Sequence, residues 1–412
     1  MHRFALVCSF FVALGFALPV GADTTITGEK KGAFFTITVP DEWNGGLVIS
    51  NHGFDFNAPE ANPGLGFIAP LWLSQGYAVA ASSYSQCCWA LFETKRDIER
   101  MVDVFIDEFG KPTHVFISGG SLGGIVTAQL VEKLEGLNIV GAYPVCGALA
   151  GSRQWDGAID VRLVYDVICG GVAPIPGGAT GLPAPGHPDS PIKNIDVLLA
   201  TNVCLGVPFT PPQFVTPEQA ARLAQFVAVT QLPESFIATD MVFAALGISN
   251  VVFEAGKLDG DNGMSNIDVT YNDPAIDAAI ERVTPDKNGR NRLQKNFTPK
   301  GHVGATKIVS IHTDGDGLVI VENESEYQSV VPASNLTVGI VDEVGNTHCG
   351  FTEAETVAGW EALRAWVAGA PQPSATDLQN TCLLLEGFGA GGPCRIDPLF
   401  VIPDMDGRIP PR

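Results

Sequence analysis

Basic residues are scarce in this sequence. Its 412 residues include 24 Lys and Arg against 45 Asp and Glu, which gives a formal net charge of −21 at pH 7. The acidic residues are spread along the chain, so the surface field repels phosphate backbones and anionic lipids. We therefore expect no nucleic-acid partner.

Closely spaced metal ligands are lacking as well. The seven His are scattered, and the nine Cys form no pair of Cys-x-x-Cys knuckles, which excludes a typical structural zinc site. The segment 259–263 is similar to the start of a calcium loop but lacks the ligands at the fifth and twelfth positions. We expect a plain loop there and no metal.

A long apolar run occurs at the N-terminus alone. Residues 4–20 follow Arg3, form a run too short for a bilayer span of roughly 20 residues, and precede the small residue Ala22. This pattern predicts a signal peptide over residues 1–22. No later run suggests a membrane span, so we expect a secreted or periplasmic protein.

The cysteine count agrees with export. One of the nine, Cys8, lies in the expected signal peptide, and eight remain. An even number in an exported chain predicts disulfides, although eight cysteines allow 105 pairings and several could be buried thiols. We favour one pair, Cys382 with Cys394, because both lie in one Gly- and Pro-rich segment.

Strand and helix patterns alternate along most of the chain. Strands are expected at 33–43, 46–51, 77–83, 114–118, 138–144, 306–313 and 336–341, and helices at 64–75, 90–109, 122–134 and 353–368. This alternation predicts an α/β fold with a mostly parallel central sheet and helices on both faces.

The alternation breaks from about residue 150 to 300. Helical patterns at 158–168, 195–204, 217–229 and 235–246 are separated there by Pro- and Gly-rich loops. We interpret residues 151–300 as a cap inserted into a core formed by 23–150 and 301–370. Residues 371–412 are expected to form an irregular C-terminal extension.

The sequence Gly119–Gly120–Ser121–Leu122–Gly123–Gly124 fits the pattern G-x-S-x-G. It lies between an expected strand and an expected helix, where small neighbours allow a turn tight enough to expose a serine hydroxyl above the sheet. The helix N-terminus beside it favours negative charge. Ser121 is thus a candidate nucleophile; the alternative is an N-cap serine in a Gly-rich turn.

A serine nucleophile needs a histidine base and a carboxylate that orients it. His348 follows the strand expected at 336–341, although it could also be a histidine of a surface loop. Asp314 and Asp316 follow the strand expected at 306–313. The spacing His312-x-x-x-Asp316-x-x-Val319 favours Asp316 as the acid. Ser, Asp and His then follow one another in the order expected for such a fold.

The negative oxygen of a tetrahedral intermediate needs backbone N–H donors. Leu122, directly after the candidate nucleophile, supplies one, and Phe54 in the loop after the strand expected at 46–51 is the candidate for the second. His52 in the same loop is the alternative base.

Five segments together resemble the secreted α/β-hydrolase esterase and lipase group: VISNHGF, GYAVAASSYS, FISGGSLGG, SIHTDGDGLV and THCGFTEAE. The resemblance covers about residues 45–150 and 300–370. It implies hydrolysis through an acyl-enzyme, no cofactor, and a cap over the active site.

Four cysteines lie near the edge of the sheet where these residues are expected. Cys349 directly follows His348, and Cys87, Cys88 and Cys146 follow expected strands. A disulfide from Cys349 to one of them would tether the histidine loop.

Carboxylic-ester hydrolysis is the function that these patterns favour, on a small-molecule or polymeric ester. A polyester depolymerase is a variant of it, expected where the cap is short. A peptidase or amidase of the same fold is the second hypothesis, in which Asp160, Asp166 or Asp240 could hold an amino terminus, although on helices we expect them to be solvated. A catalytically inactive binding protein is the third. The oligomeric state stays open.

Overall fold

The computed structural model describes residues 23–57, 59–183, 191–343 and 345–412. The expected signal peptide, residues 1–22, lies outside the described residues. The strands are β1 (Thr24–Lys30), β2 (Ala33–Val39), β3 (Gly46–Asn51), β4 (Ala78–Ser82), β5 (His114–Gly120), β6 (Ile139–Val145), β7 (Lys307–Thr313) and β8 (Leu336–Val341).

These eight strands form one sheet in the order β1-β2-β4-β3-β5-β6-β7-β8. The strands from β4 to β8 in this order pair in parallel, whereas β1 and β2 are joined in antiparallel fashion and β2 is antiparallel to β4. Every residue of the strand β3 is buried, as expected for a parallel strand covered on both faces. The predicted mostly parallel central sheet is confirmed.

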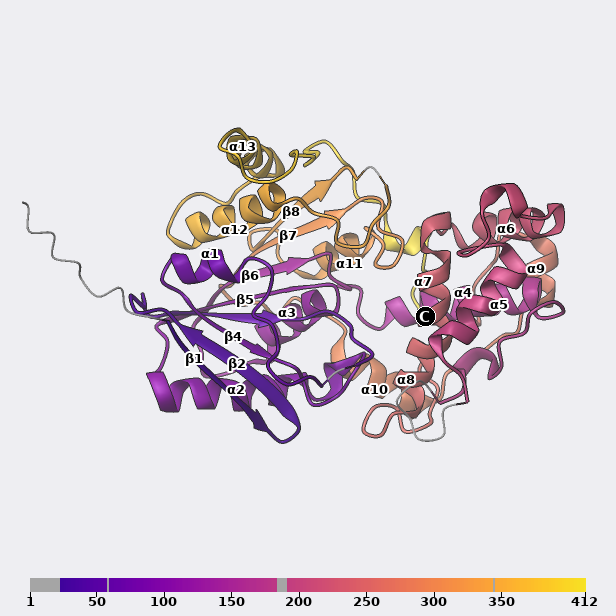
Figure 1. The fold of residues 1–412 in the computed structure, drawn as a ribbon, viewed down its shortest axis with the longest axis horizontal. Helices are drawn as coiled ribbons and strands as arrows, with labels where there is room; N and C mark the ends of the chain where they lie inside the picture. The colour runs from indigo at the N-terminus through magenta and orange to yellow at the C-terminus, as the bar shows by residue number, and fades with distance from the viewer. Residues whose placement is uncertain (1–22, 58, 184–190, 344) are drawn as a thin grey trace, which may run out of the picture.

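Helices cover both faces of this sheet (Figure 1). The core helices are α1 (Ala69–Ser74), α2 (Thr94–Phe109), α3 (Leu122–Lys133), α11 (Asn323–Val330), α12 (Glu353–Val367) and α13 (Ala375–Gly387). Helices α2 and α3 pack on one face through residues such as Phe105 and Ile125, and α1, α12 and α13 pack on the other through residues such as Trp72, Trp360 and Leu378.

In the described residues between β6 and β7 there are seven α-helices. They are α4 (Arg153–Cys169), α5 (Asn194–Leu205), α6 (Pro217–Thr230), α7 (Ile237–Val242), α8 (Ile248–Phe253), α9 (Pro274–Ala279) and α10 (Lys287–Phe297). Most of them form a lobe to the right of the sheet in Figure 1, beyond the ends of β7 and β8. A disulfide between Cys169 and Cys204 joins α4 to α5.

The helical run Glu234–Phe253, which contains α7, a π-helical turn and α8, is long and apolar enough to cross a bilayer by length and composition. In its apolar window of 18 residues, 72% is buried inside the protein, so the run packs as a core helix of the inserted lobe.

Several elements differ from the sequence-based expectation, among them α11, α13 and β1. Residues 371–412 contain the helix α13, which packs on α12 and β8, so the prediction of an irregular extension was wrong for this part. Residues 24–30 form the edge strand β1, which was not predicted because its side chains are mostly exposed and carry little apolar pattern.

Candidate active site

Ser121 lies in the sharp turn from β5 to α3. Its backbone has φ of 58° and ψ of −123°, a conformation that non-glycine residues seldom adopt. A Cβ at Gly119 would lie 2.5 Å from the carbonyl oxygen of Gly123, and one at Gly123 would collide with the carbonyl oxygen of Asn51. The glycines therefore permit a close turn that side chains at these positions would prevent.

The Ser121 side chain makes no capping hydrogen bond to α3, although Ser121 occupies the N-cap position. Its Oγ lies 2.7 Å from Nε2 of His348, and Nδ1 of His348 lies 2.6 Å from Oδ2 of Asp316. With the proton on Nδ1, the imidazole donates to Asp316 and accepts from the Ser121 hydroxyl. The structure thus brings together the three residues that the strand ends suggested.

Asp316 is fixed by backbone donors. Its Oδ1 accepts hydrogen bonds from the N–H groups of Leu318 and Val319, both at 3.0 Å, and its side chain is fully buried. Asp314 points elsewhere, because its Oδ1 accepts from the N–H of Glu343 at 2.9 Å. Of the two candidate acids, Asp316 is the one that contacts His348.

A second buried pair lies beneath this triad. Nδ1 of His312 lies 3.1 Å from Glu324 Oε1, and its Nε2 lies 2.7 Å from the carbonyl oxygen of Val319. Burial lowers the pKa of His312, but Glu324, the charge of Asp316 and the hydrogen bond to Val319 together raise that pKa above its ordinary value. Acceptors at both ring nitrogens therefore favour the imidazolium form of His312.

His312 also lies close to Asp316. Nε2 of His312 lies 3.9 Å from Oδ2 of Asp316. Sequence reasoning used His312 for spacing alone and missed Glu324, which lies on the unpredicted helix α11. No local pattern marks Glu324, because only the tertiary structure brings it to His312.

The two expected oxyanion donors lie beside Ser121. Phe54 and Leu122 both line the pocket that contains Ser121. Leu122 is the first residue of α3, so its N–H has no intrahelical acceptor. Gly53 approaches closely enough that a Cβ there would lie 3.5 Å from the Ser121 Cβ, which brings the loop of Phe54 over the serine.

His52 does not contact the serine. Its ring stacks on Tyr84 with the centroids 4.1 Å apart, and its Nδ1 lies 2.7 Å from the Gly53 carbonyl oxygen. The hydroxyl of Tyr84 donates to the carbonyl oxygen of His52 at 3.2 Å. His52 therefore braces the loop that carries Phe54, and the alternative of His52 as the base is not supported by this geometry.

The cysteine beside His348 is tied to the sheet. Cys349 forms a disulfide with Cys146, which follows β6 and whose N–H donates to the carbonyl oxygen of Ile311 in β7. Cys87 and Cys88 are bonded to each other, and the predicted pair of Cys382 and Cys394 is confirmed. The disulfide from Cys146 joins the histidine loop to the neighbouring strand ends.

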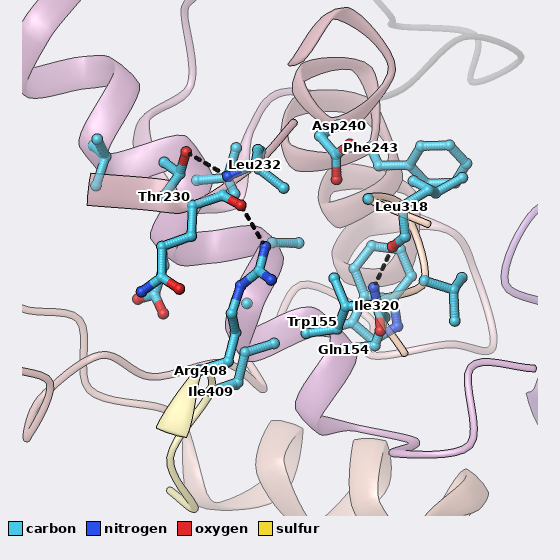
Figure 2. A pocket seen from close by; sticks show the side chains of 18 of the residues that line it. Gln154, Trp155, Thr230, Leu232, Asp240, Phe243, Leu318, Ile320, Arg408 and Ile409 are labelled. Carbon is cyan, nitrogen blue, oxygen red and sulfur yellow. Dashed lines mark hydrogen bonds between the residues drawn. The ribbon is translucent and has the colours of Figure 1, made fainter. Parts of the chain in front are cut away.

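A cavity of about 480 Å³ opens onto Ser121. Its walls come from the core, from the inserted helices, and from residues 406–410, which return to the site from the C-terminal segment (Figure 2). Most of the lining is apolar, with Trp89, Trp155 and Phe243 among the aromatic residues.

The three acidic residues that were expected to be solvated are all partly buried. Asp166 pairs with the guanidinium of Arg162 at 3.0 Å, and Asp160 accepts a hydrogen bond from the Tyr271 hydroxyl at 2.7 Å. Asp240 lines the cavity, and its Oδ2 is buried. Helix position alone could not show this, since the inserted lobe packs these faces against other elements.

Neither a family model nor a curated protein sequence matches the chain. Among solved structures, the rice cell wall degrading esterase LipA from Xanthomonas oryzae is similar at 14% identity, with 84% of this chain and 87% of that chain covered and a TM-score of 0.38. A monoacylglycerol lipase from Paleococcus ferrophilus has 13% identity, with 82% and 97% covered and a TM-score of 0.37.

An acylaminoacyl peptidase is similar at 10% identity over 89% of this chain and 41% of that chain, with a TM-score of 0.41. These likenesses are distant, and the fold is assigned on the chain's own topology. Three features identify the α/β-hydrolase fold, which the sequence motifs also suggested. They are the strand order, the turn at Ser121 between β5 and α3, and the helical insertion after β6.

Proposed function

We propose that the protein is a secreted serine hydrolase that cleaves carboxylic esters through an acyl-enzyme. Ser121 is the nucleophile, His348 the base, and Asp316 the residue that orients the base. The observation that carries the proposal is the unbroken chain of hydrogen bonds from the Ser121 hydroxyl through His348 to the fixed carboxylate of Asp316.

In the proposed reaction, His348 removes the proton from the Ser121 hydroxyl as its oxygen attacks the ester carbonyl carbon. The N–H groups of Leu122 and Phe54 stabilise the negative oxygen of the tetrahedral intermediate. His348 then donates that proton to the departing alcohol, which leaves an acyl group on Ser121. A water molecule, deprotonated by His348, releases the carboxylic acid and regenerates the serine.

The pocket favours small substrates with apolar parts. Its walls are mainly apolar, and the inserted helices and residues 406–410 close over the serine. The insertion between β6 and β7 is long, which argues against a polyester depolymerase with an open site. The complete triad likewise argues against an inactive binding protein.

A secreted or periplasmic location is part of the proposal. All eight cysteines in the described part of the chain are paired in disulfides. Such pairing is typical of proteins in oxidising compartments, and it supports export by the expected signal peptide.

Labelling with a fluorophosphonate tests the proposal. Mass spectrometry of the treated protein should find the adduct on Ser121, and the Ser121→Ala variant should take up no label and hydrolyse no p-nitrophenyl esters. Esters of increasing acyl length then report the acyl preference. Absence of both adduct and turnover in the unaltered protein would overturn the proposal and favour a binding protein.

A further inference from the structure

Asp240 has a carboxyl oxygen without a hydrogen-bond partner in the pocket that contains Ser121. It lies on α7 and lines the cavity that contains Ser121 (Figure 2). Its Oδ2 is buried and has no hydrogen-bond partner among the residues that the structure describes. The pocket therefore contains one buried carboxyl oxygen that the folded protein leaves unsatisfied.

The other carboxyl groups of the pocket are compensated. Asp160 pairs with the guanidinium of Arg412, and Asp406 lies 2.6 Å from the guanidinium of Arg153. Arg408 is a cation that lines the same pocket, but its Nη2 donates to the carbonyl oxygen of Gln231 at 2.9 Å and its Nη1 lies 3.4 Å from Glu322. In Figure 2, Arg408 and Asp240 lie on different sides of the cavity.

An unpaired buried carboxyl group opposes folding, because removing it from water is costly. Burial and the charge of Asp316 hold the pKa of Asp240 well above its ordinary value, while Arg408 acts in the opposite direction. Groups that cost stability and face a cavity are typical of binding and catalytic positions. The cost at Asp240 would be offset by a positive charge that enters with the ligand.

Aromatic rings surround the same space. Phe243, three residues after Asp240 and also on the cavity wall, contacts Phe54 with the ring centroids 4.7 Å apart. Trp89 and Trp155 also line the cavity, and their ring centroids lie 5.2 Å apart. Aromatic faces attract cations, and they bind ammonium groups most strongly where water is excluded.

We propose that Asp240 is a specificity-determining residue that binds a cationic ammonium group, so the pocket selects esters whose acyl or alcohol part is positively charged. This inference rests on the proposed ester hydrolysis at Ser121. The formal net charge of −21 would also raise the local concentration of cationic substrates. Neutral esters of the same shape lack the group that satisfies the carboxyl.

Matched ester pairs test the inference. One pair is acetylcholine and its carbon isostere, in which a tert-butyl group replaces the trimethylammonium group. The second pair makes the same exchange at the end of the acyl chain of a p-nitrophenyl ester. The ratio of kcat/KM for the charged and neutral members is measured in the unaltered protein, in Asp240→Asn, and in Asp406→Asn. The last is the control, because Asp406 lines the same cavity but is already paired.

We expect the unaltered protein to prefer the charged member of at least one pair by about tenfold or more. Asp240→Asn should reduce that ratio to about 1, and Asp406→Asn should retain it. Three outcomes would overturn the inference. They are a ratio near 1 in the unaltered protein, a preference that persists in Asp240→Asn, and an equal loss of kcat/KM for both members of a pair in Asp240→Asn.

Binding without turnover separates this inference from the proposed function. In the Ser121→Ala background, calorimetry should show choline binding that is lost when Asp240→Asn is added. If the unaltered protein hydrolyses none of the esters and Ser121 takes up no fluorophosphonate, the proposed function fails. The choline titration still tests the role of Asp240 in that case. Choline binding of equal strength with and without Asp240→Asn would overturn it.

Discussion

Two aspartates that are separated by one residue have different partners, and this difference decides the role of each. Asp316 contacts His348 and receives two backbone hydrogen bonds, whereas Asp314 accepts from the N–H of Glu343. Nε2 of His312 also lies 3.9 Å from Oδ2 of Asp316. The orienting role therefore depends on geometry that the sequence spacing reflects only in part.

Substitution of each aspartate by asparagine should separate the two roles. Asp316→Asn removes the acceptor that fixes the His348 tautomer, so kcat should fall by about 10⁴-fold with the fold retained. Asp314→Asn is the matched control and should lower kcat by less than about tenfold, measured with p-nitrophenyl esters. A larger loss in Asp314→Asn than in Asp316→Asn would contradict the assignment.

The residues of the triad could be predicted from the sequence because each follows a strand at the same edge of a parallel sheet. Ser121 has its glycine neighbours, and the order of Ser, Asp and His matches the fold. Glu324 and Asp240 could not be predicted, because their contacts join segments that are distant in the sequence. Local patterns carry no information on which buried carboxyl lacks a partner.

At the scale of elements, the histidine loop depends on a disulfide to the end of β6. The bond between Cys146 and Cys349 closes a sequence separation of 203 residues, whereas the bond between Cys382 and Cys394 closes one of 12 and does not include a neighbour of His348. The two disulfides are thus a matched pair for testing the tether.

Replacing Cys146 and Cys349 by serine should lower the free energy of unfolding by about 2–4 kcal/mol, because the unfolded chain gains freedom. It should also lower kcat, since His348 is adjacent to the released residue. The double serine variant at Cys382 and Cys394 should retain kcat. Esterase kinetics and urea denaturation measure both effects, and unchanged kcat and stability in the first variant would rule out the tether.

A second connection between elements involves a buried lysine. Lys257 follows α8, and its ammonium group donates to the carbonyl oxygen of Cys87 at 2.9 Å and pairs with Glu254 at 2.8 Å. Burial lowers its pKa to about 8, although Glu254 acts in the opposite direction. An unfolded lysine has a pKa of about 10.4.

Between these two pKa values the unfolded state binds more protons than the folded state, so the contribution of Lys257 to stability rises with pH through this window. The free energy of unfolding of the unaltered protein, relative to Lys257→Met, should increase by about 3 kcal/mol between pH 8 and 10.5. The exposed Lys111→Met is the control and should show no such trend. Urea denaturation at several pH values measures the free energy of unfolding of each protein.

The elements themselves were largely predictable, and the failures have physical causes. The helix α13 has a capping box at Ser374 and Asp377, a signal present in the sequence but outweighed by the Gly- and Pro-rich residues around it. The strand β1 pairs with β2 alone, so its exposed side chains give no buried pattern. Elements at the edge of the fold carry the weakest periodicity.

At the scale of the whole molecule, three separate parts of the chain complete the pocket. The core supplies Ser121, the inserted helices supply most of the opposite wall, and residues 406–410 close one side. Since these parts meet only after folding, the sequence could predict a cap but could not predict that the C-terminal segment lines the site.

The C-terminal segment is held by ion pairs to the inserted lobe. The guanidinium of Arg412 is almost fully buried, pairs with Asp160 on α4, and donates to the carbonyl oxygen of Asp156 at 3.0 Å. Asp156 in turn accepts from Arg290 at 2.9 Å. This network fastens the segment that carries Arg408 and Ile409 along the cavity.

Removing one partner of this buried pair should be more harmful than removing both. Arg412→Met leaves the Asp160 carboxylate uncompensated and should lower the free energy of unfolding by about 3–5 kcal/mol, measured by urea denaturation. Adding Asp160→Asn removes the unpaired charge and should restore much of that loss. The double variant should still show lower ester turnover than the unaltered protein, because the wall formed by residues 406–410 is no longer fastened. Full turnover in that variant would mean that the segment lines the pocket without shaping it.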